Sequence, residues 1–207
     1  MALKRLYVPR GLFGDVIDGL GVVMDKQVVG DGLKDGVSMG PLTTPQQKRT
    51  VETMLEEAAA AGQDVRYSGQ IDDEGDFAAG QFLRPSLVVD ANPSLSVVRD
   101  EQFGPTLPVV VYDSESDAIC MANDSNYGLS SSVWSADPAR ALGVARQLEA
   151  GFTNINAHGP TAMDGLSPFG GVKQSGIGRN FGPDGVRQFQ ETHSISGQSG
   201  QVFQWGR

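Results

Sequence analysis

Two short segments rich in glycine and proline carry the residue types with the most specific chemistry in this chain. They are Glu101-Gln-Phe-Gly-Pro105 and Ser167-Pro-Phe-Gly-Gly171. A carboxylate such as that of Glu101 can accept hydrogen bonds from both hydroxyls of a ribose, and the phenyl ring of Phe103 can pack on a nicotinamide and hold it flat for hydride transfer. Gly104 would let a ligand approach the backbone closely. Taken alone, the first segment is also a common turn, so its function depends on the rest of the chain.

Other glycine-rich and acidic segments do not carry a binding motif. Gly30–Gly36 and Gly176–Gly182 both read G-x-G-x-x-x-G, one residue too long for a dinucleotide fingerprint, and neither follows a clear strand. The acidic cluster Asp72–Asp76 lacks the spacing of an EF-hand loop. We predict structural loops at all three places.

Cys120 is the only cysteine, so no intrachain disulfide can form and a reducing compartment is expected. It stands between Ile119 and Met121 in a helical pattern, with no histidine nearby in the sequence. We predict a buried, inert thiol rather than a nucleophile, although a Cys120-dependent enzyme is an alternative. His158 and His193 are not at metal-ligand spacing, so no metal site is predicted.

Composition excludes several classes of function. The chain has 207 residues, 39% hydrophobic and 20% charged, as in an ordinary globular protein, and a formal net charge of −9. That charge argues against nucleic-acid binding, because neutralising phosphates requires a basic face. The longest apolar run, Leu107–Tyr112, is far too short to span a membrane, and the N-terminus lacks the apolar region of a signal peptide. A cytoplasmic location is predicted.

The elements that must position these residues follow from the hydrophobic pattern. Leu6–Val8 predicts a short strand, and the apolar residues between Leu12 and Leu20 repeat as one face of a helix. A second helix begins at Pro45 and ends at Gly62. Residues 30–45 and 68–81 are predicted to be loops.

The middle of the chain alternates strands and helices. Strands are predicted over Leu107–Tyr112, Ser131–Ser135 and Phe152–Asn156, with helices from Ser114 to Asn123 and from Asp137 to Ala150 between them. This order predicts parallel strands with right-handed crossovers. We therefore predict an α/β fold with an open, mostly parallel twisted sheet and helices on both faces. Ligands bind such sheets beyond the carboxyl ends of the strands, where Asn156 would lie.

The C-terminal part is predicted to be less regular. Residues 157–183 form a glycine-rich loop, followed by a short helix over Pro183–Phe189 and a short strand over Thr192–Ser196. We assign residues 1–196 to one α/β domain and 197–207 to a tail that could pair as an oligomerisation strand. The tail holds three apolar residues that a monomer would leave exposed, so a homo-oligomer is expected; they are Val202, Phe203 and Trp205.

Six segments in register resemble the aldehyde dehydrogenase superfamily and cover about residues 2–196. They are Val29–Leu33, Met39–Pro41, Arg99–Pro105, Asn123–Leu129, Ala150–Asn156 with its Asn-Ile-Asn end, and Ser167–Arg179.

The resemblance implies a role for each matched residue. Glu101 would bind the nicotinamide ribose of NAD or NADP, Phe103 would support the nicotinamide ring, and Gln47 would contact the other ribose. Phe169 and the loop Ala157–Leu166, which includes His158, would line the aldehyde channel. Asn156 would help to hold that loop.

The same resemblance implies that the reacting groups are not in this chain. In the family a cysteine attacks the aldehyde, the thiohemiacetal loses hydride to NAD(P)⁺, and water cleaves the thioester. That cysteine would immediately precede Met1, and the general base and the dinucleotide-binding domain would lie further upstream. We therefore expect this chain to be inactive alone and to bind no cofactor by itself. The alternative is a non-catalytic module that pairs with itself or with a separate N-terminal half.

Overall fold

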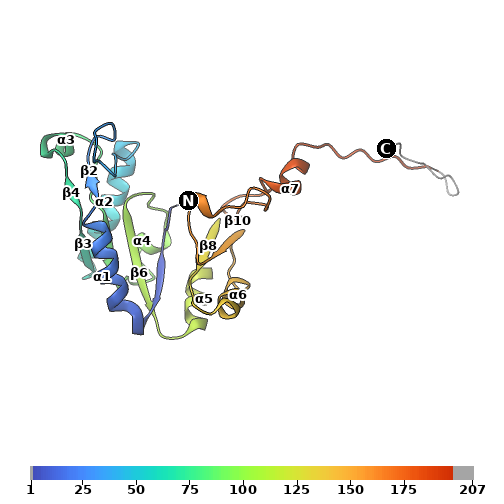
Figure 1. Ribbon diagram of the computed structural model, residues 1–207, viewed down its shortest axis with the longest axis horizontal. Coiled ribbons are helices and arrows are strands. Elements are labelled where there is room, and N and C mark those ends of the chain that lie inside the picture. Colours follow the sequence, from blue (N-terminus) through green and yellow to red (C-terminus); the bar gives the residue numbers. More distant parts are fainter. Residues whose placement is uncertain (1, 198–207) are drawn as a thin grey trace.

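The computed structural model describes residues 2–197, and its main feature is an open, mostly parallel sheet (Figure 1). Four strands lie in the order β1-β6-β5-β3, where β1 is Leu6–Pro9, β6 is Thr106–Tyr112, β5 is Ser86–Val89 and β3 is Asp64–Tyr67. The first three strands are parallel, and β3 pairs with β5 in the antiparallel sense. The predicted α/β class is confirmed.

Helices cover both faces of this sheet because its strands are apolar on both sides. On one face Ile17, from α1 (Phe13–Met24), packs with Val8 and Val109. On the other face α2 (Pro45–Ala60) and α4 (Ser96–Arg99) pack against Val88 and Val110. Neighbouring residues on one strand, such as Val109 and Val110, therefore belong to two different clusters.

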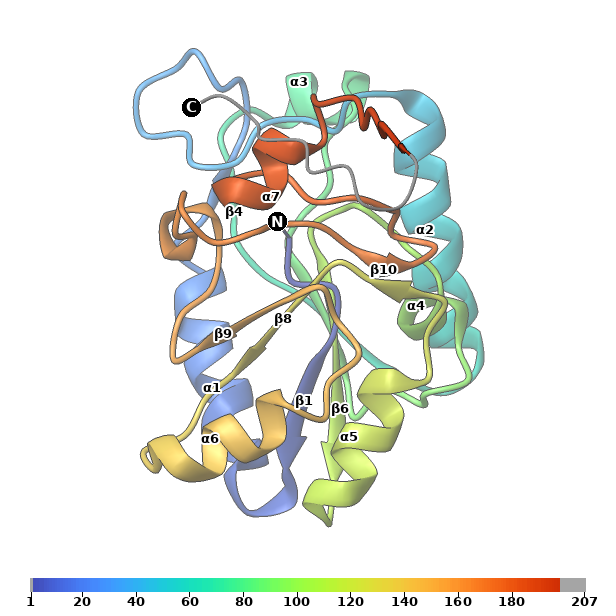
Figure 2. The ribbon, with the colours of Figure 1, turned by 90° about the vertical axis from the view of Figure 1, so that its right-hand side faces the viewer.

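The predicted βαβαβ run divides between two sheets. After β6 come α5 (Glu115–Asn123), β8 (Ser130–Val133), α6 (Pro138–Ala145) and β9 (Phe152–Ile155). Strands β8 and β9 are parallel, as predicted, but they form a two-stranded sheet of their own and do not pair with β6 (Figure 2). The expectation of one continuous sheet through all three strands was wrong. The alternation of elements in a sequence predicts strand direction but not which strands become neighbours.

Helix starts follow the side chains expected to cap them. Ser114 accepts a hydrogen bond from the backbone N–H of Asp117, and Asp137 accepts from the N–H groups of Ala139 and Arg140. Thr44 does the same at the start of α2, with Pro45 at the first position. The predicted end of α6 was wrong, because the helix stops at Ala145 and not at Ala150.

Two further predictions were wrong, and both concern short elements. The segment 68–81, predicted to be a loop, contains β4 (Gln70–Ile71) and α3 (Glu74–Ala79), which begins because Asp73 caps the N–H of Asp76. Strand β4 pairs with β2 (Val28–Val29). The residues Thr192–Ser196 form no strand, and Figure 1 shows them extending away from the body.

The remaining short elements lie in several parts of the chain. The strand β7 (Tyr127–Gly128) pairs in the antiparallel sense with β10 (Val172–Lys173), and the helix α7 covers Gly182–Arg187, near the predicted position. Two 3₁₀ turns, η1 (Arg10–Leu12) and η2 (Pro160–Ala162), complete the set. The proposed oligomerisation tail, with Val202, Phe203 and Trp205, lies outside the described residues.

Candidate active site

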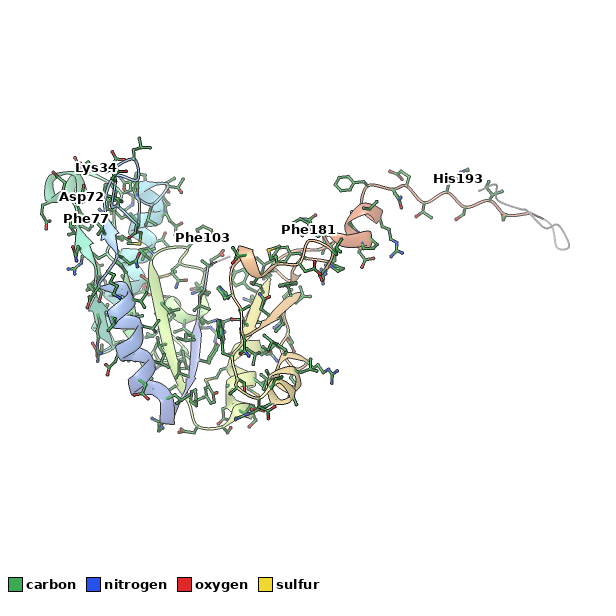
Figure 3. The ribbon with its side chains drawn as sticks, in the orientation of Figure 1. Lys34, Asp72, Phe77, Phe103, Phe181 and His193 are labelled. Carbon is green, nitrogen blue, oxygen red and sulfur yellow. The ribbon has the colours of Figure 1, made fainter. Side chains whose placement is uncertain are left out.

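Phe103 is held in an unusual conformation on the turn that leads into β6. Its φ is +46°, a left-handed value that few aromatic residues adopt, and its side chain is 68% exposed (Figure 3). The amide Nε2 of Gln47, on the first turn of α2, donates hydrogen bonds to the backbone oxygens of Gln102 and Phe103, the second at 3.3 Å. A helix and a turn far apart in the sequence thus fix the position of this ring.

The residues on either side of Phe103 hold the turn in place through buried contacts. Gln102 is 2% exposed, and its Nε2 donates to the backbone oxygen of Thr106 at 3.0 Å. Gly104 packs on α2 so closely that an added Cβ would lie 2.6 Å from Cγ2 of Val51. Packing on the helix therefore requires a glycine here, and the close approach of a ligand to its backbone stays a prediction.

A shallow cleft of about 230 Å³ lies beside Phe103. Its walls come from the segment before β1, from the loop that precedes α2, from the segment before β5, and from the turn itself; they are Ala2, Met39, Gly40, Leu42, Leu83, Phe103, Gly104 and Pro105. Because the turn leads into β6 and Ala2 precedes the parallel β1, this cleft lies at the amino ends of these two strands. The expectation of a site beyond the carboxyl ends is met only by Asn156, which follows β9.

Glu101 and Gln47 differ in what they leave free for a ligand. The Glu101 side chain is exposed and, within residues 2–197, its carboxylate has no hydrogen bond or ion pair. The Nε2 of Gln47 is already bound to backbone oxygens, so only its Oε1 can reach a ligand. The residue predicted to contact a ribose acts first as a support for Phe103.

Phe169 belongs to an aromatic cluster in the second predicted segment. Its backbone N–H donates to the backbone oxygen of Asn180, and its backbone oxygen accepts from the N–H of Asn180, both at 2.7 Å. The centroid of its ring lies 5.6 Å from that of Phe152, in an edge-on arrangement, and 6.5 Å from that of Phe181. The segment passes very close to the start of β9, where a Cβ added to Gly151 would lie 1.8 Å from the oxygen of Gly170.

Asn156 joins the carboxyl ends of β8 and β9. Its Oδ1 accepts from the N–H of Ser135 and its Nδ2 donates to the oxygen of the same residue, both at 2.8 Å. Its φ of +53° turns the chain into the loop where Ala157 and His158 are half-buried. Both ring nitrogens of His158 are inaccessible and have no partner among the described residues.

Further along the same loop, Asp164 forms a polar turn. It accepts hydrogen bonds from the N–H of Leu166 and from Oγ of Ser167, and these bonds lower the pKa of its exposed carboxyl group. The turn therefore keeps its shape as long as Asp164 is ionised, just before the segment that carries Phe169.

Phe103 and the aromatic cluster of Phe169 lie toward the same side of the molecule. Figure 3 shows Phe103 and Phe181, the neighbour of Phe169, along its upper part. The Nζ of Lys4 donates to the backbone oxygen of Val97 at 2.9 Å, and burial, followed by repulsion from Arg5, lowers its pKa to about 8.

Cys120 takes no part in this arrangement. It lies on α5, outside both segments, and it is exposed, so the prediction of a buried thiol was wrong. The helix turns this residue outward because α5 packs only one side against β1 and β6. Among residues 2–197, no three metal-binding side chains gather, and no helix is long and apolar enough to cross a membrane.

Sequence reasoning missed three residues that shape the site. Phe152 and Phe181 build the cluster around Phe169, and Gln102 anchors the turn of Phe103. The one signal available was the polar Gln102 beside an apolar ring, which indicates a specific hydrogen bond when it is buried. Nothing in the spacing of Phe152 and Phe181 predicts that they meet.

Comparison with known proteins decides the family. Residues 1–195 match the model of the aldehyde dehydrogenase family. This chain belongs to that family. It is 32% identical over 191 residues to geranial dehydrogenase from Castellaniella defragrans, covering 92% of this chain and 38% of that protein. It is 35% identical over 188 residues to glutarate-semialdehyde dehydrogenase from Pseudomonas aeruginosa, covering 91% and 38%.

Solved structures of the family show the same fold. An aldehyde dehydrogenase from Mycobacterium tuberculosis complexed with NAD⁺ superposes with a TM-score of 0.86 at 32% identity, over 97% of this chain and 40% of that one. Betaine aldehyde dehydrogenase from Staphylococcus aureus in complex with NAD⁺ gives 0.82 at 32% identity, over 90% and 37%. The chain thus spans about two fifths of the length of the relatives it matches.

Proposed function

We propose that this chain is the portion of an NAD(P)-dependent aldehyde dehydrogenase that supplies two walls of the active site. In the longer protein, a cysteine that is not among these 207 residues would attack the aldehyde, the adduct would lose hydride to NAD(P)⁺, and water would release the carboxylic acid. The observation that carries the proposal is the turn of Phe103, which Gln47 fixes and which presents a free carboxylate, Glu101, beside an exposed ring.

The chemistry of this turn suits a nicotinamide nucleotide. When bound, the nucleotide would accept a hydride from the aldehyde carbon. Glu101 would accept hydrogen bonds from the ribose hydroxyls, and Phe103 would hold the ring flat. The cleft beside Phe103 is open and shallow, and this fits a wall that needs a facing domain to enclose the ligand.

Phe169 supports the second wall. Its ring is fixed by Phe152, at the start of β9, and by Phe181, so it offers a rigid apolar surface for the aldehyde. Asn156, Ala157 and His158 follow the other end of β9 and would line the channel further along. Rigid aromatic rings orient an apolar substrate without a large cost in side-chain entropy.

The same arguments favour a chain that is inactive alone. Cys120 lies on α5, in neither wall, so it does not replace the missing nucleophile. A loss of the nucleophile alone costs several orders of magnitude in rate. We further propose residues 1–196 as the catalytic-domain portion, a cytoplasmic location, and assembly into a homo-oligomer through the tail 197–207.

The test uses the reading frame extended upstream of Met1. If the preceding codons encode Gln-x-Cys, the longer protein is expected to reduce NAD⁺ or NADP⁺ with an aldehyde. Glu101→Gln should then raise the KM for the cofactor about tenfold, the size of one charge-assisted hydrogen bond, whereas the matched change Glu56→Gln on the exposed side of α2 should not. An unchanged KM in Glu101→Gln would refute the assigned role.

A second candidate is a non-catalytic assembly module. It is favoured by the segment 188–197, which extends away from the body with Phe189 89% exposed. Light scattering after size exclusion tests this candidate, because a strict monomer at all concentrations would count against a module that pairs with itself, and also against the homo-oligomer proposed above.

A further inference from the structure

Lys4 joins the first residues of the chain to the end of α4. Its Nζ donates to the backbone oxygen of Val97 at 2.9 Å, across 93 positions of sequence. Val97 lies in the last turn of α4, where carbonyl groups have no donor within the helix.

The loop with Glu101 and Phe103 begins directly after this contact. Helix α4 ends at Arg99, and the Glu101–Pro105 turn follows before β6. One end of the loop is therefore fixed by Lys4 and its middle by Gln47. No other side chain of the described residues contacts the backbone of the last turn of α4 by a hydrogen bond.

We propose that Lys4 is a positioning residue for the cofactor site: its ammonium group fixes the end of α4 and thereby the loop that presents Glu101 and Phe103. The meaning of this loop as a cofactor wall rests on the function proposed above. The hydrogen bond between Lys4 and Val97 lies within this chain, so its effect on the loop can be measured without any cofactor.

The contact depends on pH because of what surrounds the ammonium group. Burial is the largest influence on its pKa and lowers it to about 8; Arg5 acts in the same direction, and Asp100 and Glu101 oppose it. Below pH 8 the charged group donates strongly and attracts the two carboxylates. As the pH rises through 8, a neutral amine donates more weakly and this attraction disappears, so the loop should loosen.

The test places 4-fluorophenylalanine at position 103 of the full chain and follows its ¹⁹F resonance from pH 6.5 to 9.5. The resonance should shift with a midpoint near pH 8. In Lys4→Arg the shift should be absent, because a guanidinium stays charged over this range. Lys26→Arg, a change on the exposed residue after α1, should keep it.

Two outcomes would overturn the role of Lys4. One is a flat ¹⁹F profile in the unmodified sequence. The other is the same transition in Lys4→Arg, which would assign it to the α-amino group, whose ordinary pKa is also about 8. If Lys4→Arg does not fold, the titration of the Lys4 ¹³Cε resonance in the unmodified chain shows directly whether Lys4 causes the transition.

A kinetic readout in the longer protein separates this inference from the proposed function. Lys4→Met should raise the KM for the cofactor about tenfold with little change in kcat, and Lys4→Arg should restore it. If Glu101→Gln raises KM and Lys4→Met does not, the cofactor wall stands and the role of Lys4 is wrong. If the ¹⁹F transition occurs but Glu101→Gln leaves the KM for the cofactor unchanged, Lys4 positions the loop and the proposed role of the loop in cofactor binding is wrong.

Discussion

The side-chain amide of Gln47 donates a hydrogen bond to the backbone oxygen of Phe103, 56 positions further along the chain. This bond joins the start of α2 to a turn whose φ of +46° is costly for an aromatic residue. The backbone of Phe103 keeps this conformation because two side chains hold the turn. Gln47 donates to the backbone oxygens of Gln102 and Phe103, and the buried side chain of Gln102 donates to the backbone oxygen of Thr106. The exposed ring is the consequence of that support.

Removing the Gln47 amide should loosen the turn. Gln47→Ala is expected to lower the free energy of unfolding by about 1–2 kcal/mol, since two backbone oxygens lose their donor. Urea denaturation measures the change. Gln46→Ala, on the exposed neighbour, should stay within about 0.5 kcal/mol. Equal effects of the two changes would show that the contact does not stabilise the turn.

The close approach of Gly151 to Gly170 should make the first of these positions intolerant. A Cβ on Gly151 would meet backbone oxygen at 1.8 Å, so Gly151→Ala is expected to destabilise the protein by more than about 2 kcal/mol. Gly143→Ala is the control, because it lies in α6 with open space around it and a helix favours alanine there. A thermal midpoint unchanged in Gly151→Ala would contradict the packing of the segment that carries Phe169.

The single thiol should react in the native protein. Because Cys120 is exposed, a thiol reagent such as DTNB is expected to modify one group per chain without denaturant. Cys120→Ser should leave the free energy of unfolding within about 0.5 kcal/mol of the original. A thiol that reacts only after unfolding would restore the earlier expectation of burial.

Tyr7 should affect stability at alkaline pH. Burial raises the pKa of its phenol, and the hydroxyl donates to the backbone oxygen of Met121 at 3.0 Å. Above about pH 10 the unfolded chain loses this proton before the folded chain does, so stability falls as the pH rises toward the folded pKa.

The effect is isolated by comparing the original chain with Tyr7→Phe, in which all other groups titrate alike. The difference in unfolding free energy should favour tyrosine by about 1 kcal/mol at pH 7 and shrink above pH 10. A difference that stays constant to pH 11 would contradict the raised pKa. Urea unfolding at several pH values provides the measurement.

Local signals predicted the elements well. The caps at Ser114 and Asp137 set two helix starts as predicted, because the side chain that satisfies the first N–H groups is adjacent in the sequence, and a third helix begins at Pro45 as predicted. The resemblance to aldehyde dehydrogenases, read from six segments, is confirmed as family membership.

Non-local relationships could not be predicted. Whether β8 pairs with β6 or only with β9 depends on distant packing, and Cys120 lies in a helix whose buried side is not obvious from its weak apolar pattern. Gln47 donates to backbone oxygens, which every residue has, so no sequence pattern identifies its partner. The roles assigned to Glu101, Phe103 and Phe169 are still predictions.

The most direct measurement is the absorbance of NADH or NADPH at 340 nm when the purified 207-residue chain meets a set of aldehydes and each oxidised cofactor. If this chain supplies walls of the active site without the nucleophile, no product should form above the blank, in the original or in Cys120→Ser. Sustained turnover proportional to the amount of protein would contradict the account.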